Sequence, residues 1–146
     1  MDLKSWLTGR PELSGKIDSA VHSVSLCDVA RPDAPLIYVN RGFENLTGYT
    51  PGEVIGRNCR FLQAPETDAA TVAAIRDAVV GGKPLLIDIL NQRKNGTRFW
   101  NRLSLRPVHD AAGVLTHIIG IQSDITAVKD IEERMVGLAA DLAAIR

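Results

Sequence analysis

The sequence predicts an α+β domain: a five-stranded antiparallel sheet with short helices on one face. Two extended segments are followed by several short helical segments and then by three longer extended segments. Apolar and polar residues alternate along the last three, as they do in half-buried strands. This order favours helices packed on one face of an antiparallel sheet. Residues 22–126 carry the pattern, between an N-terminal helical cap at 1–21 and a C-terminal amphipathic helix at 127–146.

The first half of this core alternates strands with short helices. Residues 24–28 and 36–40 read as strands, joined by a turn rich in proline and aspartate. Asn40 is placed to cap a helix over 41–47, which a glycine ends. The segment 50–53, Thr-Pro-Gly-Glu, is a capping box with proline at the first helical position, and it predicts one further helical turn.

The most regular helical pattern covers residues 68–80. Thr67 or Asp68 is placed to cap its first turn, and Gly81-Gly82 ends it. The helix carries one apolar stripe. The stripe consists of Val72, Ile75, Val79 and Val80.

The last three strands are predicted at 85–94, 97–109 and 114–125. Asn95-Gly96 between the first two predicts a hairpin with a type I′ turn. A second turn, ending in a glycine at position 113, joins the other two.

One face of each of these strands is apolar except for a single carboxamide, which is Asn91, Asn101 or Gln122. A buried amide without a partner costs on the order of a few kcal/mol. Any one of them is explained as a satisfied core residue or as a residue at a frayed strand end. The three together favour a ligand with a polar edge, such as the pyrimidine ring of a flavin. Their apolar neighbours are Leu85, Ile87, Ile89, Phe99, Leu103, Leu105 and Ile118.

Residues 56–63, Gly-Arg-Asn-Cys-Arg-Phe-Leu-Gln, hold Cys59 between an arginine, two amides and two apolar anchors. A cysteine kept beside fixed polar groups is usually retained for its reactivity. At all eight positions the segment resembles the signature of LOV domains, the blue-light-sensing branch of the PAS family. The resemblance covers residues 22–126 and implies the PAS/LOV fold. The chain is similar to the short bacterial type that carries no effector domain.

The resemblance implies a reversible photochemical bond between the Cys59 sulfur and the C4a carbon of a flavin. Gln122 would then change its hydrogen bond to flavin N5, which carries a new proton, and so relay the signal. Asn91 and Asn101 would contact the pyrimidine edge, while Arg60 and Arg76 would bind a phosphate. The cofactor-binding set it implies is Ser25, Cys27, Asn58, Arg60, Leu62, Gln63, Arg76, Val79, Asn91, Asn101, Leu103, Leu105, Ile118 and Gln122. The linker before the central helix has no insertion that would house an adenine, which favours FMN over FAD or riboflavin.

Four positions depart from close relatives. Cys27 stands where plant domains generally carry threonine, and passive packing is favoured there over a redox or tuning role. Leu103 and Ile118 stand where many relatives have phenylalanine, and Ala34 where asparagine is common. We expect these differences to affect how fast the bond reverts.

The other face of the sheet is also apolar, so we expect it to be covered. From position 128 onward, apolar residues alternate three and four apart, which is typical of a coiled-coil seam and favours a homodimer. The alternative is a helix folded back on its own sheet. Because the chain ends at Arg146, we expect output through dimer geometry or a separate effector protein. The outer-face residues are Leu26, Leu86, Leu90, Trp100, Leu115, Ile119 and Ile121, and the seam residues are Val128, Ile131, Met135, Leu138, Leu142 and Ile145.

The composition and the cysteine spacing limit the partners, the compartment and the activities that we expect for this chain. The 17 basic and 17 acidic residues balance, which argues against nucleic acid or a membrane surface as partner. No signal peptide and no apolar run of roughly 20 residues is present, so we expect a cytoplasmic protein with reduced thiols and no Cys27–Cys59 disulfide. No metal-ligand spacing is seen. An oxidoreductase that uses a bound flavin and a PAS module without photochemistry remain as alternatives; we do not expect an enzyme.

Overall fold

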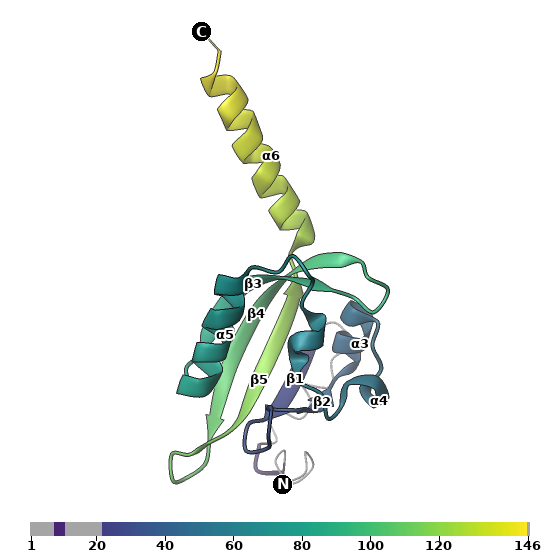
Figure 1. Ribbon diagram of the computed structural model, residues 1–146, viewed down its shortest axis with the longest axis vertical. Helices are drawn as coiled ribbons and strands as arrows, with labels where there is room; N and C mark the ends of the chain where they lie inside the picture. The colour runs from purple at the N-terminus through teal and green to yellow at the C-terminus, as the bar shows by residue number, and fades with distance from the viewer. Residues whose placement is uncertain (1–7, 11–21, 146) are drawn as a thin grey trace.

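The computed structural model describes residues 8–10 and 22–145, and it contains one five-stranded antiparallel sheet in the order β2-β1-β5-β4-β3 (Figure 1). The predicted fold class is confirmed, and the helices between β2 and β3 lie on one face of the sheet. The predicted N-terminal cap at 1–21 falls outside the described residues, except for 8–10. The elements are β1 (Ser23–Asp28), β2 (Leu36–Val39), α3 (Arg41–Thr47), α4 (Pro51–Val54), η1 (Cys59–Leu62), α5 (Ala69–Gly81), β3 (Leu85–Gln92), β4 (Arg98–His109), β5 (Leu115–Asp124) and α6 (Thr126–Ala143).

The predicted caps of α3 and α4 are confirmed. The Asn40 carboxamide oxygen accepts from the backbone N–H groups of Phe43 and Val24, both at 2.9 Å, so it ties the start of α3 to β1. The Glu53 carboxylate accepts from the Thr50 backbone N–H at 3.0 Å and closes the capping box of α4. These local signals worked because each depends on residues only three apart.

The predicted type I′ turn between β3 and β4 is wrong. Only Gly96 has a positive φ, of 84°, whereas a type I′ turn also needs one at Asn95. The Gly96 N–H donates to the Arg93 carbonyl at 2.9 Å, and the Arg93 N–H donates to the Thr97 carbonyl at 2.9 Å. The loop is therefore a type I turn followed by a left-handed glycine, and the Asn95 side chain supports it by accepting from the Thr97 N–H at 2.9 Å.

One predicted side-chain direction is wrong, and one residue of a predicted apolar stripe is exposed. Leu115 was placed on the outer face, but the register shifts between Val108 and His109, and this bulge turns Leu115 toward the face that α5 covers. Val80 belongs to the predicted apolar stripe of α5, yet the residue is 80% exposed. Both positions lie at the end of an element, where simple periodicity fails.

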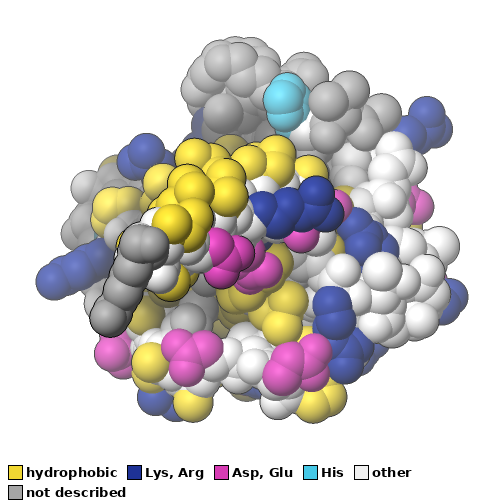
Figure 2. All heavy atoms as spheres, turned by 90° about the horizontal axis from the view of Figure 1, so that it is seen from above, with side chains coloured by type: hydrophobic (Ala, Val, Ile, Leu, Met, Phe, Trp, Pro, Cys, Tyr) yellow, Lys and Arg dark blue, Asp and Glu magenta, His cyan; other side chains and the backbone are white. Residues whose placement is uncertain are grey.

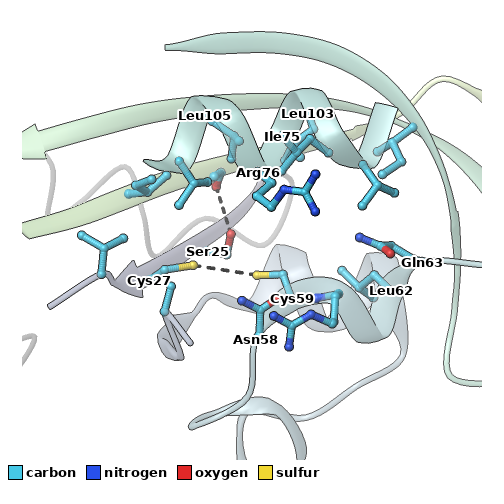
Figure 3. A pocket seen from close by; sticks show the side chains of 18 of the residues that line it. Ser25, Cys27, Asn58, Cys59, Leu62, Gln63, Ile75, Arg76, Leu103 and Leu105 are labelled. Carbon is cyan, nitrogen blue, oxygen red and sulfur yellow. Dashed lines mark hydrogen bonds between the residues drawn. The ribbon is translucent and has the colours of Figure 1, made fainter. Parts of the chain in front are cut away.

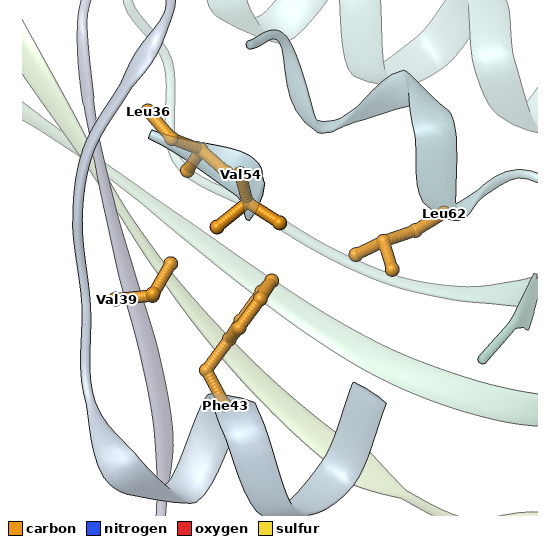
Figure 4. Packing of buried hydrophobic residues seen from close by; sticks show 5 residues of the cluster. All are labelled: Leu36, Val39, Phe43, Val54 and Leu62. Carbon is orange, nitrogen blue, oxygen red and sulfur yellow. The ribbon is translucent and has the colours of Figure 1, made fainter. Parts of the chain in front are cut away.

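The apolar core beneath α3 and α4 is built from β2, both helices and η1. Phe43 and Val54 are fully buried, and Figure 4 shows them packed among the other members of the cluster. Cys59 packs against this cluster from the side of η1. The core therefore fixes the position of the cysteine. The cluster consists of Leu36, Val39, Phe43, Val54 and Leu62.

Helix α6 projects away from the sheet, so the folded-back alternative is wrong (Figure 1). No residue of α6 is buried. Its first turn is nevertheless fixed to the outer face, because the Ile125 N–H donates to the Trp100 carbonyl at 2.9 Å and Lys129 forms an ion pair with Asp88 at 3.0 Å. Viewed along α6, hydrophobic side chains gather on one side and carboxylates on another (Figure 2).

Among the residues that the structure describes, those of the outer sheet face differ in burial. Leu26 is buried, but Leu86 is 69% exposed and Ile121 is 40% exposed. None of the described helices combines the length and apolarity that crossing a bilayer requires.

The contact of α3 with β1 gives a stability prediction. A Cβ at Gly42 would lie 2.2 Å from the His22 carbonyl oxygen, whereas a Cβ at Gly52 would meet nothing within 4 Å. Each is the second residue of its helix. We expect Gly42→Ala to lower the free energy of unfolding by about 2 kcal/mol or more. Gly52→Ala, the matched control, should stay within about 1 kcal/mol of the parent. Equal thermal midpoints for both variants would contradict this packing.

Candidate functional site

The segment 56–63 is attached to both edges of the sheet. At its start, the Gly56 N–H donates to the Leu36 carbonyl and the Leu36 N–H donates to the Arg57 carbonyl, both at 2.8 Å. At its end, Gln63 pairs with Asn91 in an isolated antiparallel bridge. Because β2 and β3 are the two edge strands, the segment crosses the whole inner face of the sheet. Gly56 has a φ of 89°, which favours glycine at the first attachment.

Within this segment, η1 was not predicted as a helix. Asn58 is its N-cap: the Asn58 side-chain oxygen accepts from the Arg60 N–H at 2.9 Å, and its amide donates to the Asp33 carbonyl at 2.8 Å. The first residue of η1 is Cys59. Asn58 thus orients the cysteine, in addition to lining the cavity described next.

A cavity of about 700 Å³ lies between α5, η1 and the inner face of the sheet (Figure 3). Its volume falls in the range of small-molecule and cofactor sites. All of the site residues predicted from the sequence line it. They are Ser25, Cys27, Asn58, Cys59, Arg60, Leu62, Gln63, Arg76, Val79, Asn91, Asn101, Leu103, Leu105, Ile118 and Gln122.

Sequence reasoning missed the contribution of the β1–β2 loop, from which Val29, Arg31, Asp33 and Ala34 also line the cavity. Asp33 and Ala34 both have a positive φ, of 67° and 45°. Alanine rarely adopts the left-handed backbone conformation, so the surrounding structure must hold Ala34 in it. The proline-rich composition of the loop indicated a turn, but no local signal indicated that the turn reaches η1.

The three predicted amides lie on one wall of the cavity, and each is held by its neighbours. The Asn101 side-chain amide donates to the side-chain oxygen of Asn91 at 3.0 Å, and the Asn101 side-chain oxygen accepts from the Ser123 N–H at 3.2 Å. Gln122 accepts from the Ser23 hydroxyl at 2.6 Å and donates to the Ser25 oxygen at 2.8 Å. All three amides are buried. The second lone pair and the second N–H of such groups leave them able to bond a ligand edge.

Cys59 points toward Cys27, which comes from β1 (Figure 3). Their sulfur atoms lie 3.9 Å apart, within weak hydrogen-bond range, and both cysteines are free. This contact and burial raise the pKa of the Cys59 thiol well above its ordinary value. Cys59 is therefore a protonated thiol at neutral pH.

Two guanidinium groups line the cavity opposite the amide wall. Arg60 forms a two-pronged ion pair with the Asp33 carboxylate, at 2.8 and 2.5 Å, which lowers the pKa of Asp33. Arg76 points from α5 into the space between α5 and η1 (Figure 3). Two arginines against one aspartate leave a local excess of positive charge that suits a phosphate.

These residues fit a flavin mononucleotide, and they satisfy its different parts separately. The apolar walls, including Leu62, Val79 and Leu105, suit a flat ring system. The amide wall suits a ring edge that both donates and accepts hydrogen bonds. The arginines suit a phosphate, and the Cys59 thiol also lines the cavity.

Comparison with known proteins shows the family to which the chain belongs. Residues 23–127 match the family described as "PAS domain". Phototropin-2 of Oryza sativa subsp. japonica is 47% identical over 115 residues, which cover 79% of this chain and 13% of that protein. A blue-light-activated histidine kinase of Brucella ovis is 52% identical over 95 residues, covering 65% of this chain and 19% of that protein.

Among solved structures, an RNA-binding light-oxygen-voltage receptor is 41% identical with a TM-score of 0.84, covering 93% of this chain and 38% of that one. The chain thus spans only a small part of the two curated relatives and well under half of this receptor. The fold and the family match define a PAS domain. Within that family, the chain belongs to the LOV branch, whose members sense blue light.

Proposed function

We propose that this LOV domain is a blue-light photoreceptor that binds FMN in the cavity and uses Cys59 as its photochemical nucleophile. The observation that carries the proposal is the placement of the Cys59 thiol in a cavity of about 700 Å³ whose opposite wall presents three buried amides. Relatives that are named for blue-light responses share the family. No second candidate function has an observation of comparable weight.

Asn91 and Asn101 would bind the pyrimidine edge of the flavin, because they are joined to each other and fixed on adjacent strands. Asn58 and Gln63 would contact the ribityl chain and the ring. Arg60 and Arg76 would bind the phosphate, and Arg60 would then exchange part of its bond with Asp33 for the more highly charged group.

When bound, FMN would supply a light-activated ring carbon able to bond sulfur and an adjacent ring nitrogen able to take a proton, and Cys59 would provide both the sulfur and the proton. The chain must therefore keep that proton on Cys59 in the dark. The raised pKa of the Cys59 thiol meets this need. Leu62 and the core behind it hold the cysteine in place, which favours a reversible reaction at one position.

Gln122 is placed to carry the signal out of the cavity. Its amide is held between the Ser23 and Ser25 hydroxyl groups on β1, and a hydroxyl can reverse its role as donor or acceptor. If flavin N5 changed from a hydrogen-bond acceptor to a donor, the Gln122 side-chain amide would rotate. Its hydrogen bonds with Ser23 and Ser25 would then rearrange. Since α6 begins at Thr126, soon after Gln122 on the chain, the rearrangement would reach the base of that helix.

Output would pass through α6 and a homodimer. The seam residues Ile131, Met135, Leu138 and Leu142 are each more than half exposed, which leaves an unpartnered apolar stripe on a projecting helix. A second copy of the helix would cover this stripe by heptad packing. A separate effector protein is the other route by which a small domain of this kind would act.

The first test concerns Cys59. We expect Cys59→Ala and Cys59→Ser to retain the yellow flavin absorption and to lose reversible bleaching under blue light, because no sulfur remains to bond. Absorption spectra before and after illumination measure both properties. Cys27→Ser, prepared alongside, should still bleach. The proposal is refuted if a Cys59 variant bleaches to the same spectrum as the parent.

The second test concerns the phosphate. A hydrogen bond to a charged group contributes about 1.5–3 kcal/mol, so Arg76→Ala should weaken FMN binding by roughly tenfold to a hundredfold. Riboflavin, which lacks the phosphate, should bind the variant and the parent alike. Fluorescence titration of the flavin-free protein measures both constants. Arg106→Ala, on an exposed position of β4 that does not line the cavity, is the control. An equal loss for both flavins would mean that Arg76 does not bind phosphate.

The third test concerns the relay. Gln122→Leu should bleach normally but show little difference between the light and dark scattering profiles, because its side chain cannot exchange donor and acceptor. Leu138→Glu on the exposed stripe of α6 should be monomeric in both states, which reports on the dimer separately. A Gln122→Leu protein with the full light–dark difference would exclude the relay.

A further inference from the structure

The cavity holds a second thiol for which the proposed photochemistry has no use. Cys27 lies in β1, where the register with β2 shifts between Leu26 and Cys27. Its sulfur atom lies 3.9 Å from the sulfur atom of Cys59. These are the only two cysteines in the sequence. Their side chains come from segments 32 positions apart and point toward each other across the cavity wall (Figure 3).

We propose that Cys27 and Cys59 form a reversible disulfide under oxidising conditions, and that this bond switches the light response off. The consequence for the light response rests on the proposed function, whereas the formation of the bond does not. The inference adds a redox input to a light sensor, so that the domain would respond to light only while its thiols are reduced.

The geometry favours the bond. A disulfide has a sulfur–sulfur distance of about 2.05 Å, so the two atoms must approach by about 1.9 Å. Cys59 is the first residue of a single 3-10 turn, and Cys27 borders a strand irregularity; neither lies in the middle of a long regular element. Rotation about the side-chain bonds and a small local shift of these two segments would supply the approach.

The chemistry needs a two-electron oxidant, and a hydroperoxide is the class that we infer. One cysteine sulfur attacks the peroxide, the O–O bond breaks, and the sulfur becomes a sulfenic acid while the other oxygen leaves as alcohol or water. The second sulfur then displaces hydroxide from the first, which forms the S–S bond and releases water. Two thiols are oxidised and one peroxide is reduced. A dithiol reductant restores both thiols by exchange.

The consequence for the light response follows from the atoms involved. Cys59 in a disulfide has neither a free sulfur nor a proton to give, so it cannot bond to a flavin. The amide wall and the arginines are not altered, so the flavin should remain bound. Intracellular disulfides, where they occur in ordinary organisms, are usually transient and redox-sensing, which fits a reversible pair at a functional site.

The test uses the purified flavin-loaded protein, kept in the dark and treated with hydrogen peroxide or with buffer. Three quantities are measured: free thiols after denaturation, intact mass, and the amplitude of blue-light bleaching. We expect peroxide to remove both thiols, to lower the mass by two hydrogen atoms within a monomer, and to reduce bleaching in proportion to the thiols lost. Flavin absorption should persist, and dithiothreitol should restore thiols, mass and bleaching together.

Cys27→Ser is the matched variant, with Cys27→Ala as a second substitution in case the first folds poorly. Without its partner, Cys59 cannot form the intramolecular bond. Because Cys27 also lines the cavity, the bleaching of each variant is compared with that of its own untreated sample. After peroxide, the variants should show no loss of two hydrogen atoms within a monomer, and any loss of bleaching should follow a gain of oxygen atoms. The proposal is overturned if the parent retains two thiols, if it gains oxygen atoms in place of losing hydrogens, or if it forms disulfide-linked dimers on a non-reducing gel.

The same experiment separates the two proposals. If the reduced protein does not bleach at all, the proposed photochemistry fails, while thiol titration and mass still report whether the disulfide forms. If the reduced protein bleaches and the oxidised protein bleaches equally with its thiols gone, the disulfide exists but does not act as a switch.

Discussion

The attachment of the segment 56–63 to both edges of the sheet is the constraint on which the rest of the site depends. Backbone hydrogen bonds to Leu36 hold one end, and the bridge between Gln63 and Asn91 holds the other. A segment fixed at two points on opposite edges has to cross the inner face, and α5 then closes the space above it. Cys59 owes its position in the cavity wall to this crossing and to the core behind it.

The polar groups of the site form a connected set that leads from the cavity to the surface. Gln122 is bound to two serines of β1, and Asn101 is bound both to Asn91 and to the Ser123 backbone. The next residues begin α6, whose first turn is fixed to the outer face of the sheet. A buried polar group without a hydrogen bond costs free energy, so a change in the bonding of one amide requires its neighbours to rearrange their hydrogen bonds. In the relay proposed above, this network would favour transmission along β5 over a change confined to the cavity.

Most of the predicted cavity residues came from the resemblance to LOV domains, and local or periodic signals gave a smaller part. Alternation along the strands placed three amides on one face, and the helical stripe brought Val79 to the same cavity. Predictions failed where the pairing of two strands shifted by one residue or where the loop adopted another turn type. The first case is Leu115, which lies beside a bulge, and the second is the turn that ends in Gly96. A bulge or a turn type depends on the twist and pairing of both strands, which one strand's pattern does not contain.

By itself, the sequence predicted the order of the strands and of the α-helices, the caps of α3 and α4, and the inward face of the sheet, since each depends on neighbouring residues or on a fixed period. Only the tertiary structure decided that Asp33 pairs with Arg60, that Cys27 meets Cys59, and that α6 points away from the sheet. These outcomes depend on how segments far apart in the chain are brought together. Their relative positions follow from sheet pairing and core packing, and no local pattern specifies them.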